Sequence, residues 1–329
     1  MKKLFNLQLF AENLNTNTTG SAGLSTENKT FYDKTLIKLA GPSLVHHQFG
    51  QKRNIPKNGG KTIEFRKFSP LGKATTPLTE GVTPDGQSLD VKTIVANVNQ
   101  YGGYVTVSDV LDMAAIDNTV SETLSLIGDQ AGQTLDTIER DALVGGTNVQ
   151  YADGSVAARN ALTSANKMSV DVLKRAVRTL KKFNTPKIDG YYIAIMHPSC
   201  AYDLMSDPEW IDAQKHTNGN VDKLYKGEIG QIAGVKVVES TEAKVFGAKG
   251  SGGATVYATL VFGKDAYGVT EIEGGGLETI VHQLGSGGSA DPLNQRATIG
   301  WKSTHTAERL VEEYMVRVET SSSFSDEEN

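Results

Sequence analysis

The chain contains 329 residues with a formal net charge of −5, enough for one large domain or two of ordinary size. The absence of a basic excess argues against a nucleic-acid-binding protein, and no apolar run approaches the ~20 residues that a membrane-spanning helix needs. The single cysteine, Cys200, excludes an intrachain disulfide and suits a protein that assembles in a reducing cytoplasm.

The first thirteen residues resemble a signal peptide, because two lysines precede an apolar stretch. However, Asn6 and Gln8 interrupt that stretch, and no small residues follow where cleavage would occur. We interpret the segment as a short apolar clamp for another surface, joined to the body by a flexible polar arm and a short helix that begins at Thr30. Its candidate subunit-contact residues are Leu4, Leu7 and Phe10.

A long hairpin is predicted next. Residues 61–68 alternate between polar and apolar side chains, and a second alternating run begins at Val91. The stretch between them is polar and rich in proline and glycine, so we expect an arm that projects from the body and is stabilised by a neighbouring subunit. A disordered surface loop is the alternative. The candidate contact residues on this arm are Lys61, Arg66 and Lys73.

Residues Thr119–Val144 carry apolar side chains at spacings of three and four, which predicts an amphipathic α-helix lying on a sheet. Thr119 and Glu122 form a capping box, and the two glycines after Val144 predict a left-handed exit. Asp136 and Glu139 fall on the polar side, which we expect to face solvent or a partner.

A compact α/β block from about residue 167 to residue 273 is expected to fold by itself. Its predicted elements are a helix capped by Ser169, a buried strand at residues 191–196, a short helix at 199–204, a glycine-punctuated hairpin at 227–238 and a strand at Val256–Phe262. The basic face of the first helix lacks interleaved aromatic residues, so we interpret it as solvated or subunit-facing. Arg175 and Arg178 are its candidate contact residues.

No catalytic, cofactor-binding or metal-binding residues are predicted. His46 and His47 are adjacent but have no further histidine or cysteine at a ligand spacing, so we interpret them as structural. His197 and Cys200 are separated by a turn, and no third group that would activate a nucleophile is indicated.

Two long strands close the chain. Residues 297–301 and 314–318 alternate, and we expect them to pair with each other and with a strand at residues 104–107, forming the sheet beneath the long helix. The acidic tail, residues 321–329, is expected to be disordered.

This order of arm, hairpin, long helix, α/β insertion and closing strands resembles the HK97-like major capsid fold of tailed phages, an α+β fold. Three phrases, LFNLQLFAE, GEIGQIAGVKVVES and DPLNQRATIGWK, resemble recurring phrases of the N4-type major capsid protein family. The resemblance implies an N-terminal arm and short helix at 1–48, an extended E-loop hairpin at 49–103, a P-domain with its spine helix at 104–146 and its closing strands at 286–320, a mixed α/β A-domain at 147–285, and the tail.

The resemblance implies a major capsid protein and not an enzyme. Such a structural subunit needs no cofactor. Such a subunit assembles with itself into pentamers and hexamers of an icosahedral head shell, with portal and decoration proteins as further partners. It would be made in the bacterial cytoplasm, reside in the virion, and enclose double-stranded DNA without sequence-specific binding. Mild negative charge agrees with the last point. Fewer than fifty residues precede the hairpin, so a scaffolding protein should be separate or absent.

Three alternatives remain at this stage. An encapsulin-like shell shares the fold but encloses enzymes. A secreted β-rich surface protein would need a true signal peptide, and an enzyme would need a convergent polar site.

Overall fold

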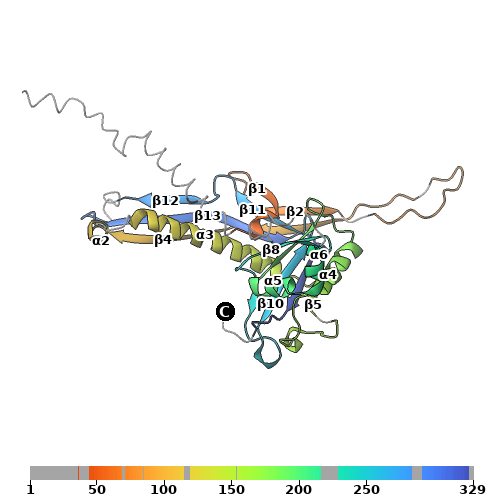
Figure 1. Ribbon diagram of the computed structural model, residues 1–329. Coiled ribbons are helices and arrows are strands. Elements are labelled where there is room, and N and C mark those ends of the chain that lie inside the picture. Colours follow the sequence, from red (N-terminus) through yellow and green to blue (C-terminus); the bar gives the residue numbers. More distant parts are fainter. Residues whose placement is uncertain are drawn as a thin grey trace, which may run out of the picture. The chain divides into compact units, whose positions relative to one another are not determined.

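The computed structural model describes residues 36, 44–68, 71–83, 85–114, 119–152, 154–215, 229–283 and 291–325 (Figure 1). The chain forms two compact units. The first comprises Met1–Pro42, Gly102–Gly132 and Leu277–Ser303, and the second comprises Ser43–Tyr101, Gln133–Gly276 and Thr304–Asn329. The predicted apolar clamp, the flexible arm and all but one residue of the helix expected from Thr30 lie outside the described residues.

In the first unit a β-layer is built on the first part of β13 (Arg296–Arg309). β12 (Glu278–His282) runs antiparallel to it, from Glu278 opposite Lys302 to His282 opposite Thr298. β4 (Asn99–Ser108) also pairs with β13, which confirms the predicted pairing of the closing strand with the strand at residues 104–107. Short α2 (Asp109–Ala114) follows β4.

Trp301 of β13 is 4% exposed, so its indole packs inside the first unit. Its indole Nε1 donates to Oε1 of Gln130 at 3.2 Å. Beside Trp301, β4 and β13 approach each other closely. A Cβ added at Gly300 would lie only 2.9 Å from the carbonyl oxygen of Gly103. Glycine is therefore the residue that fits there.

The long helix, α3, spans Thr119–Val144 as predicted. Leu124, Ile127, Ala131 and Leu135 of the apolar stripe are buried, while the side chains of Thr119 and Val120 lie outside the described residues. The expectation for the polar side is wrong at two positions. Asp136 and Glu139 are completely buried, because histidines from elsewhere in the chain supply their hydrogen-bond partners.

The end of α3 also differs from the expectation. Neither Gly145 nor Gly146 has a positive φ, so the exit is not left-handed. Instead, Nη1 of Arg309 donates to the carbonyl of Ala142, and Nη1 of Arg317 donates to the carbonyl of Val144 and to that of Gly146. Cationic side chains thus satisfy the last carbonyls, and they also complement the negative end of the helix dipole.

The second unit is organised around a mixed sheet with seven strands among the described residues. Their order is β5 (Val149–Tyr151), β14 (Met315–Thr320), β10 (Val256–Phe262), β6 (Tyr192–Met196), β8 (Val235–Glu239) and β7 (Gly230–Ile232), with β9 (Val245–Phe246) also paired to β10. β6 is buried along its whole length, because its alternate residues face two different cores. A continuous apolar run is the pattern expected of such a strand.

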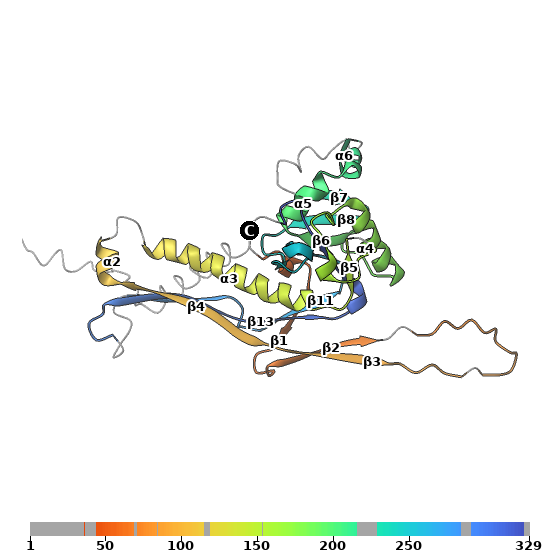
Figure 2. The same cartoon turned by 90° about the horizontal axis from the view of Figure 1, so that it is seen from below.

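Helix α4 (Val170–Lys182) covers one face of this sheet and packs against β14 and β10 (Figure 2). Its predicted cap is confirmed, since Oγ of Ser169 accepts from the backbone N of Val172. The other core gathers Leu143 and Val144 from the end of α3 with Ile193 and Ile195 of β6. Among the described residues, the other helical elements of this unit are α5 (Pro198–Met205), α6 (Pro208–Lys215) and the 3-10 turns His46–Gln48 (η3), Arg159–Ala161 (η4), Ser251–Gly253 (η5) and Glu312–Tyr314 (η7).

The closing strand β14 does not pair with β13, so that part of the prediction is wrong. It runs antiparallel to β10, from Tyr257 opposite Thr320 to Phe262 opposite Met315, and parallel to β5. In the sheet, β14 therefore lies between β10 and β5. The block from residue 167 to residue 273 therefore lacks an inner strand of its own sheet, which argues against its independent folding.

Part of the expected disordered tail is ordered. Ser321, Ser322 and Ser325 are buried, and the hydroxyls of Ser321 and Ser325 lie 2.9 Å apart. Both hydroxyls also donate to the carbonyl of Thr255. Serine fits this site because its hydroxyl is small enough to be buried and still finds a hydrogen-bond partner. Residues 326–329 lie outside the described residues.

A second strand group of this unit contains β1 (Gln51–Ile55), which lies parallel to β11 (Tyr267–Ile272). β11 in turn runs antiparallel to the last part of β13, with Tyr267 opposite Arg309. The predicted hairpin is confirmed, since β2 (Thr62–Phe68) pairs antiparallel with β3 (Val91–Asn97) in register from Thr62 opposite Asn97 to Phe68 opposite Val91.

Candidate functional site

The hairpin β2–β3 is anchored at its base. Phe65 is buried, and a Cβ at Gly268 of β11 would lie 2.8 Å from its ring, so the two elements are in close contact. The guanidinium of Arg53 lies 5.7 Å from the centroid of the same ring. Lys67 Nζ lies 3.4 Å from Oε2 of Glu313. These contacts fix the root of the hairpin only.

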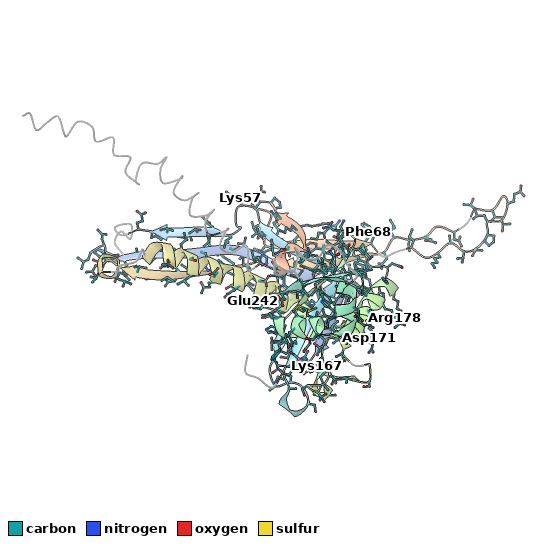
Figure 3. The ribbon with its side chains drawn as sticks, in the orientation of Figure 1. Lys57, Phe68, Lys167, Asp171, Arg178 and Glu242 are labelled. Carbon is teal, nitrogen blue, oxygen red and sulfur yellow. The ribbon has the colours of Figure 1, made fainter. Side chains whose placement is uncertain are left out.

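Beyond the root the hairpin is exposed. Every described residue between 71 and 90 is exposed, and Figure 3 labels Phe68, which is 62% exposed where the paired strands give way to the loop. The exposed apolar residues of the hairpin are Phe68, Leu71, Leu78, Val82, Leu89, Val91 and Val95. Apolar side chains in this number on one exposed segment indicate a surface that another protein covers.

The predicted contact residues of the hairpin are all exposed. Lys61 precedes β2, Arg66 lies within it, and Lys73 lies in the loop. Nη2 of Arg66 is 3.7 Å from Oε2 of Glu64 in an exposed pair, which holds either side chain only weakly. Leu4, Leu7 and Phe10 lie outside the described residues.

Helix α4 presents a second charged surface. Arg175 and Arg178 are both exposed, and Figure 3 shows Asp171 and Arg178 on the side of α4 away from its sheet. Arg175 pairs with Asp171 at 2.6 Å, one helical turn earlier. The apolar side of the same helix is buried, so the charged side remains available for a partner.

Several apolar side chains of the first unit are exposed and were not singled out from the sequence. They come from β4, α2, α3 and the segment before β13: Tyr104, Val105, Val110, Leu111, Leu126 and Leu293.

A surface cavity of about 780 Å³ lies in the second unit. Lysines 187, 236 and 264 line it together with aspartates 189 and 265. The described residues that line the cavity include no histidine or cysteine. The side chains that most often act as nucleophile or general base therefore do not converge there.

His197 and Cys200 have separate partners. Nδ1 of His197 accepts from the backbone N of Ser199 and so caps α5, and burial lowers the pKa of His197. Cys200 is fully buried with Sγ 3.5 Å from Oγ1 of Thr320, and burial raises the pKa of its thiol to about 12. A thiol in this state is a poor nucleophile.

Several buried ionisable groups of the described residues gather on the polar side of α3. His46 is held by both oxygens of Asp136: its backbone N donates to Oδ1 and its ring Nδ1 lies against Oδ2, each at 2.7 Å. Both residues are almost completely buried, at 1% and 0% exposure. This pair is mutually satisfied and fastens η3 to α3.

One helical turn further, Glu139 lies between two histidines. Its Oε1 is 2.7 Å from Nδ1 of His47 and 2.8 Å from Nε2 of His305. Burial alone would raise the pKa of Glu139, but His305 and His47 lower it below its ordinary value. On the other side of the His305 ring, Oε1 of Glu271 is 3.9 Å from Nδ1.

This cluster was missed from the sequence. No local pattern linked the two adjacent histidines to the two acidic residues three positions apart on the helix, because the two pairs lie about ninety residues apart in the sequence. The third histidine, His305, is also distant in the sequence, so only the fold reveals that it lies beside His47 and Glu139. His47, Glu139 and His305 are the described residues that could hold a metal ion, with their ligand atoms within 4.8 Å of one another.

Comparison with known proteins identifies the family. Residues 91–316, more than half of the chain, match the family model described as phage capsid protein. The chain belongs to the phage capsid protein family. No curated protein matches its sequence. Within the described residues of this capsid protein, no helix is both long and apolar enough to cross a membrane.

Solved capsid structures resemble its fold. A chain of the capsid of Ralstonia phage GP4 superposes with a TM-score of 0.68 at 16% identity, covering 83% of this chain and 87% of that one. The cyanophage Pam1 capsid gives 0.68 at 14% identity, with coverage of 84% and 89%. The capsid of cyanophage P-SCSP1u gives 0.63 at 16% identity, with coverage of 84% and 87%. The predicted HK97-like α+β fold and the predicted function as a phage capsid protein are thus confirmed. The encapsulin-like alternative is not favoured.

Proposed function

We propose that this capsid protein is the major capsid subunit of a tailed phage of the N4 type. It assembles with itself into pentamers and hexamers of an icosahedral head around double-stranded DNA. The observation that carries the proposal is the capsid family match over residues 91–316, together with the exposed hairpin, which buries little apolar surface within its own chain. The six segments expected from the sequence would be the N-arm (1–48), E-loop (49–103), P-domain (104–146 and 286–320), A-domain (147–285) and tail (321–329).

The protein would be assembled in the bacterial cytoplasm and reside in the virion, with a structural and not an enzymatic role. Portal, decoration and, where used, separate scaffolding proteins would be its other partners. Its net charge of −5 supports enclosure of DNA without sequence-specific binding, because a shell that must release its genome gains nothing from tight phosphate contacts.

The subunit contacts would be made by the candidate residues Leu4, Leu7, Phe10, Lys61, Arg66, Lys73, Arg175 and Arg178. The hairpin is the best supported of these surfaces, because an exposed segment with several apolar residues lowers its free energy when a neighbour covers it. Its ordering entropy is then lost only on assembly.

Negative-stain electron microscopy of the full chain, expressed alone and with its neighbouring genes, tests the proposal. We expect closed icosahedral shells. The double variant Arg66→Glu with Lys73→Glu should lower the shell yield at least severalfold, whereas the exposed Lys249→Glu should assemble as the wild type does. A wild-type chain that stays monomeric under every condition would refute self-assembly, and shells filled with an enzyme would favour the nanocompartment alternative.

The N-terminal clamp needs a separate test. Removing residues 1–13 should leave the circular dichroism spectrum of the subunit unchanged but lower shell yield or thermal stability. Unchanged yield and melting temperature of the truncated shells would rule out the clamp.

A further inference from the structure

We infer that His47, Glu139 and His305 form a binding site for a divalent transition-metal ion of the zinc type. Two imidazole nitrogens and one carboxylate oxygen are a ligand set that Zn²⁺ and Co²⁺ accept well, whereas Mg²⁺ and Ca²⁺ prefer oxygen ligands. The three residues come from η3, α3 and β13, so a bound ion would join three elements that are far apart in the sequence. All three belong to the second compact unit.

The spacing of the ligand atoms fits a small tetrahedral ion. Bonds of about 2.0–2.2 Å to zinc place tetrahedral ligand atoms roughly 3.3 Å apart. Here Oε1 of Glu139 lies 2.7 Å and 2.8 Å from the two imidazole nitrogens, and all three atoms fall within 4.8 Å. To hold an ion, the two pairs that include Glu139 must separate slightly, while the two imidazole nitrogens are already no more than 4.8 Å apart.

Unsatisfied polar atoms point to a missing partner. Oε2 of Glu139 and both ring nitrogens of His305 are buried without a hydrogen-bond partner, although Nε2 of His305 lies 2.8 Å from Oε1 of Glu139. That distance is short enough for a hydrogen bond, but the direction of the N–H is not suitable. Buried polar atoms are usually paired. A metal ion would take the Nε2 lone pair of His305, and it would pair Oε2 of Glu139 as well if the carboxylate bound through both oxygens. The neighbouring His46–Asp136 pair shows no such deficiency, since each carboxylate oxygen has a partner.

The surroundings suit a metal ligand as well. Glu271 lies 3.9 Å from Nδ1 of His305, on the side of the ring opposite Glu139. This distance is too long for a hydrogen bond, but a negative charge on that side favours the tautomer with the proton on Nδ1, which leaves the Nε2 lone pair facing the ion. His47 is 19% exposed, whereas Glu139 and His305 are buried, so an ion can enter from the His47 side.

Metal titration of the full-length chain tests the site, after treatment with chelator and transfer to chelator-free buffer. Calorimetry with Zn²⁺ should give one ion per chain, and Co²⁺ should give a visible d–d absorption spectrum of a nitrogen- and oxygen-ligated tetrahedral ion. Zn²⁺ should raise the melting temperature, and EDTA should reverse the rise. These readouts do not depend on shell assembly, so they are independent of the proposed function.

Variants separate this site from adventitious binding. His47 lies at the partly exposed edge of the site, so the His47→Asn variant should fold, and circular dichroism would verify this. It should bind Zn²⁺ at least tenfold more weakly than the wild type. Glu139→Gln should behave in the same way, while His282→Asn, which removes an exposed histidine, should bind as the wild type does. Absence of stoichiometric Zn²⁺ and Co²⁺ binding by the wild type, or wild-type affinity in His47→Asn, would show that the cluster is only a hydrogen-bonded network.

Discussion

Arg159 and Glu319 form a two-bond fork inside the second unit. Nε of Arg159 donates to Oε2 of Glu319 at 2.8 Å, and Nη2 donates to Oε1 at 2.7 Å. Nε of Arg317 also donates to Oε1 at 2.8 Å, and the Glu319 side chain is completely buried. The Arg159 guanidinium lies 3.5 Å from the centroid of the Phe246 ring. The Glu319 carboxylate on β14 therefore binds Arg159 of η4 and Arg317, the residue that also satisfies the end of α3. Arg159 in turn stacks on Phe246 of β9.

Glu319→Gln should destabilise the protein by about 3–5 kcal/mol, because removing one partner of a buried ion pair leaves the others uncompensated. Denaturant unfolding followed by circular dichroism measures this change. The matched control is Glu209→Gln, which breaks the exposed Lys174–Glu209 pair and should leave the unfolding midpoint nearly unchanged. Equal effects of the two substitutions would show that the buried fork has no special importance.

Trp301→Ala should cost about 3–5 kcal/mol of folding free energy, because it empties a large buried site in the first unit. Trp301→Phe keeps most of the ring volume but removes the hydrogen bond to Gln130, so its cost should be nearer 1 kcal/mol. Unfolding midpoints of the two variants check the order. Normal yields of shells from Trp301→Ala would contradict the packing role.

Limited proteolysis of unassembled subunits should cut first between residues 71 and 90. Every described residue there is exposed, and an exposed segment with few contacts opens easily. Mass spectrometry of the first fragments locates the cut. Assembled shells should resist cleavage at the same site, and equal rates in subunits and shells would argue against a neighbour covering the hairpin.

Cys200 should be inert to thiol reagents in the native protein at pH 8 and react at once after denaturation. Burial raises the pKa of its thiol to about 12, so the thiolate is scarce as well as inaccessible, and raising the pH towards that value should not speed the reaction until the protein unfolds. Absorbance with a chromogenic disulfide reagent follows the reaction. Rapid native labelling would show that this region opens readily.

A fragment of residues 167–273 should fail to fold, because it lacks β14 and leaves β10 with an open edge. Appending residues 315–325 through a flexible linker should restore part of the native circular dichroism, since it returns the missing strand and the buried serines. A shuffled appended sequence serves as the control. Cooperative unfolding of the fragment alone would support the independence expected from the sequence.

Local patterns in the sequence determined the elements themselves. The course of α3, the Ser169 cap of α4, the course of β10 and the β2–β3 hairpin all follow from side-chain periodicity and capping within a few residues. The order of those elements, with three family-like phrases, was enough to indicate the capsid fold. Periodicity reports which face of an element is apolar, and that information is contained in neighbouring residues.

Only the tertiary structure decided which elements meet. β14 alternates as the closing strand of either sheet would, so its pairing with β10 instead of β13 could not be read from its own residues. Asp136 and Glu139 are polar by composition but buried in the fold, because His46 and His47 arrive from a distant segment and bond to them, with His305 beside Glu139. The end of α3 depends likewise on Arg309 and Arg317. A buried charge is tolerable only beside its partner, and the partner's position is a property of the folded chain.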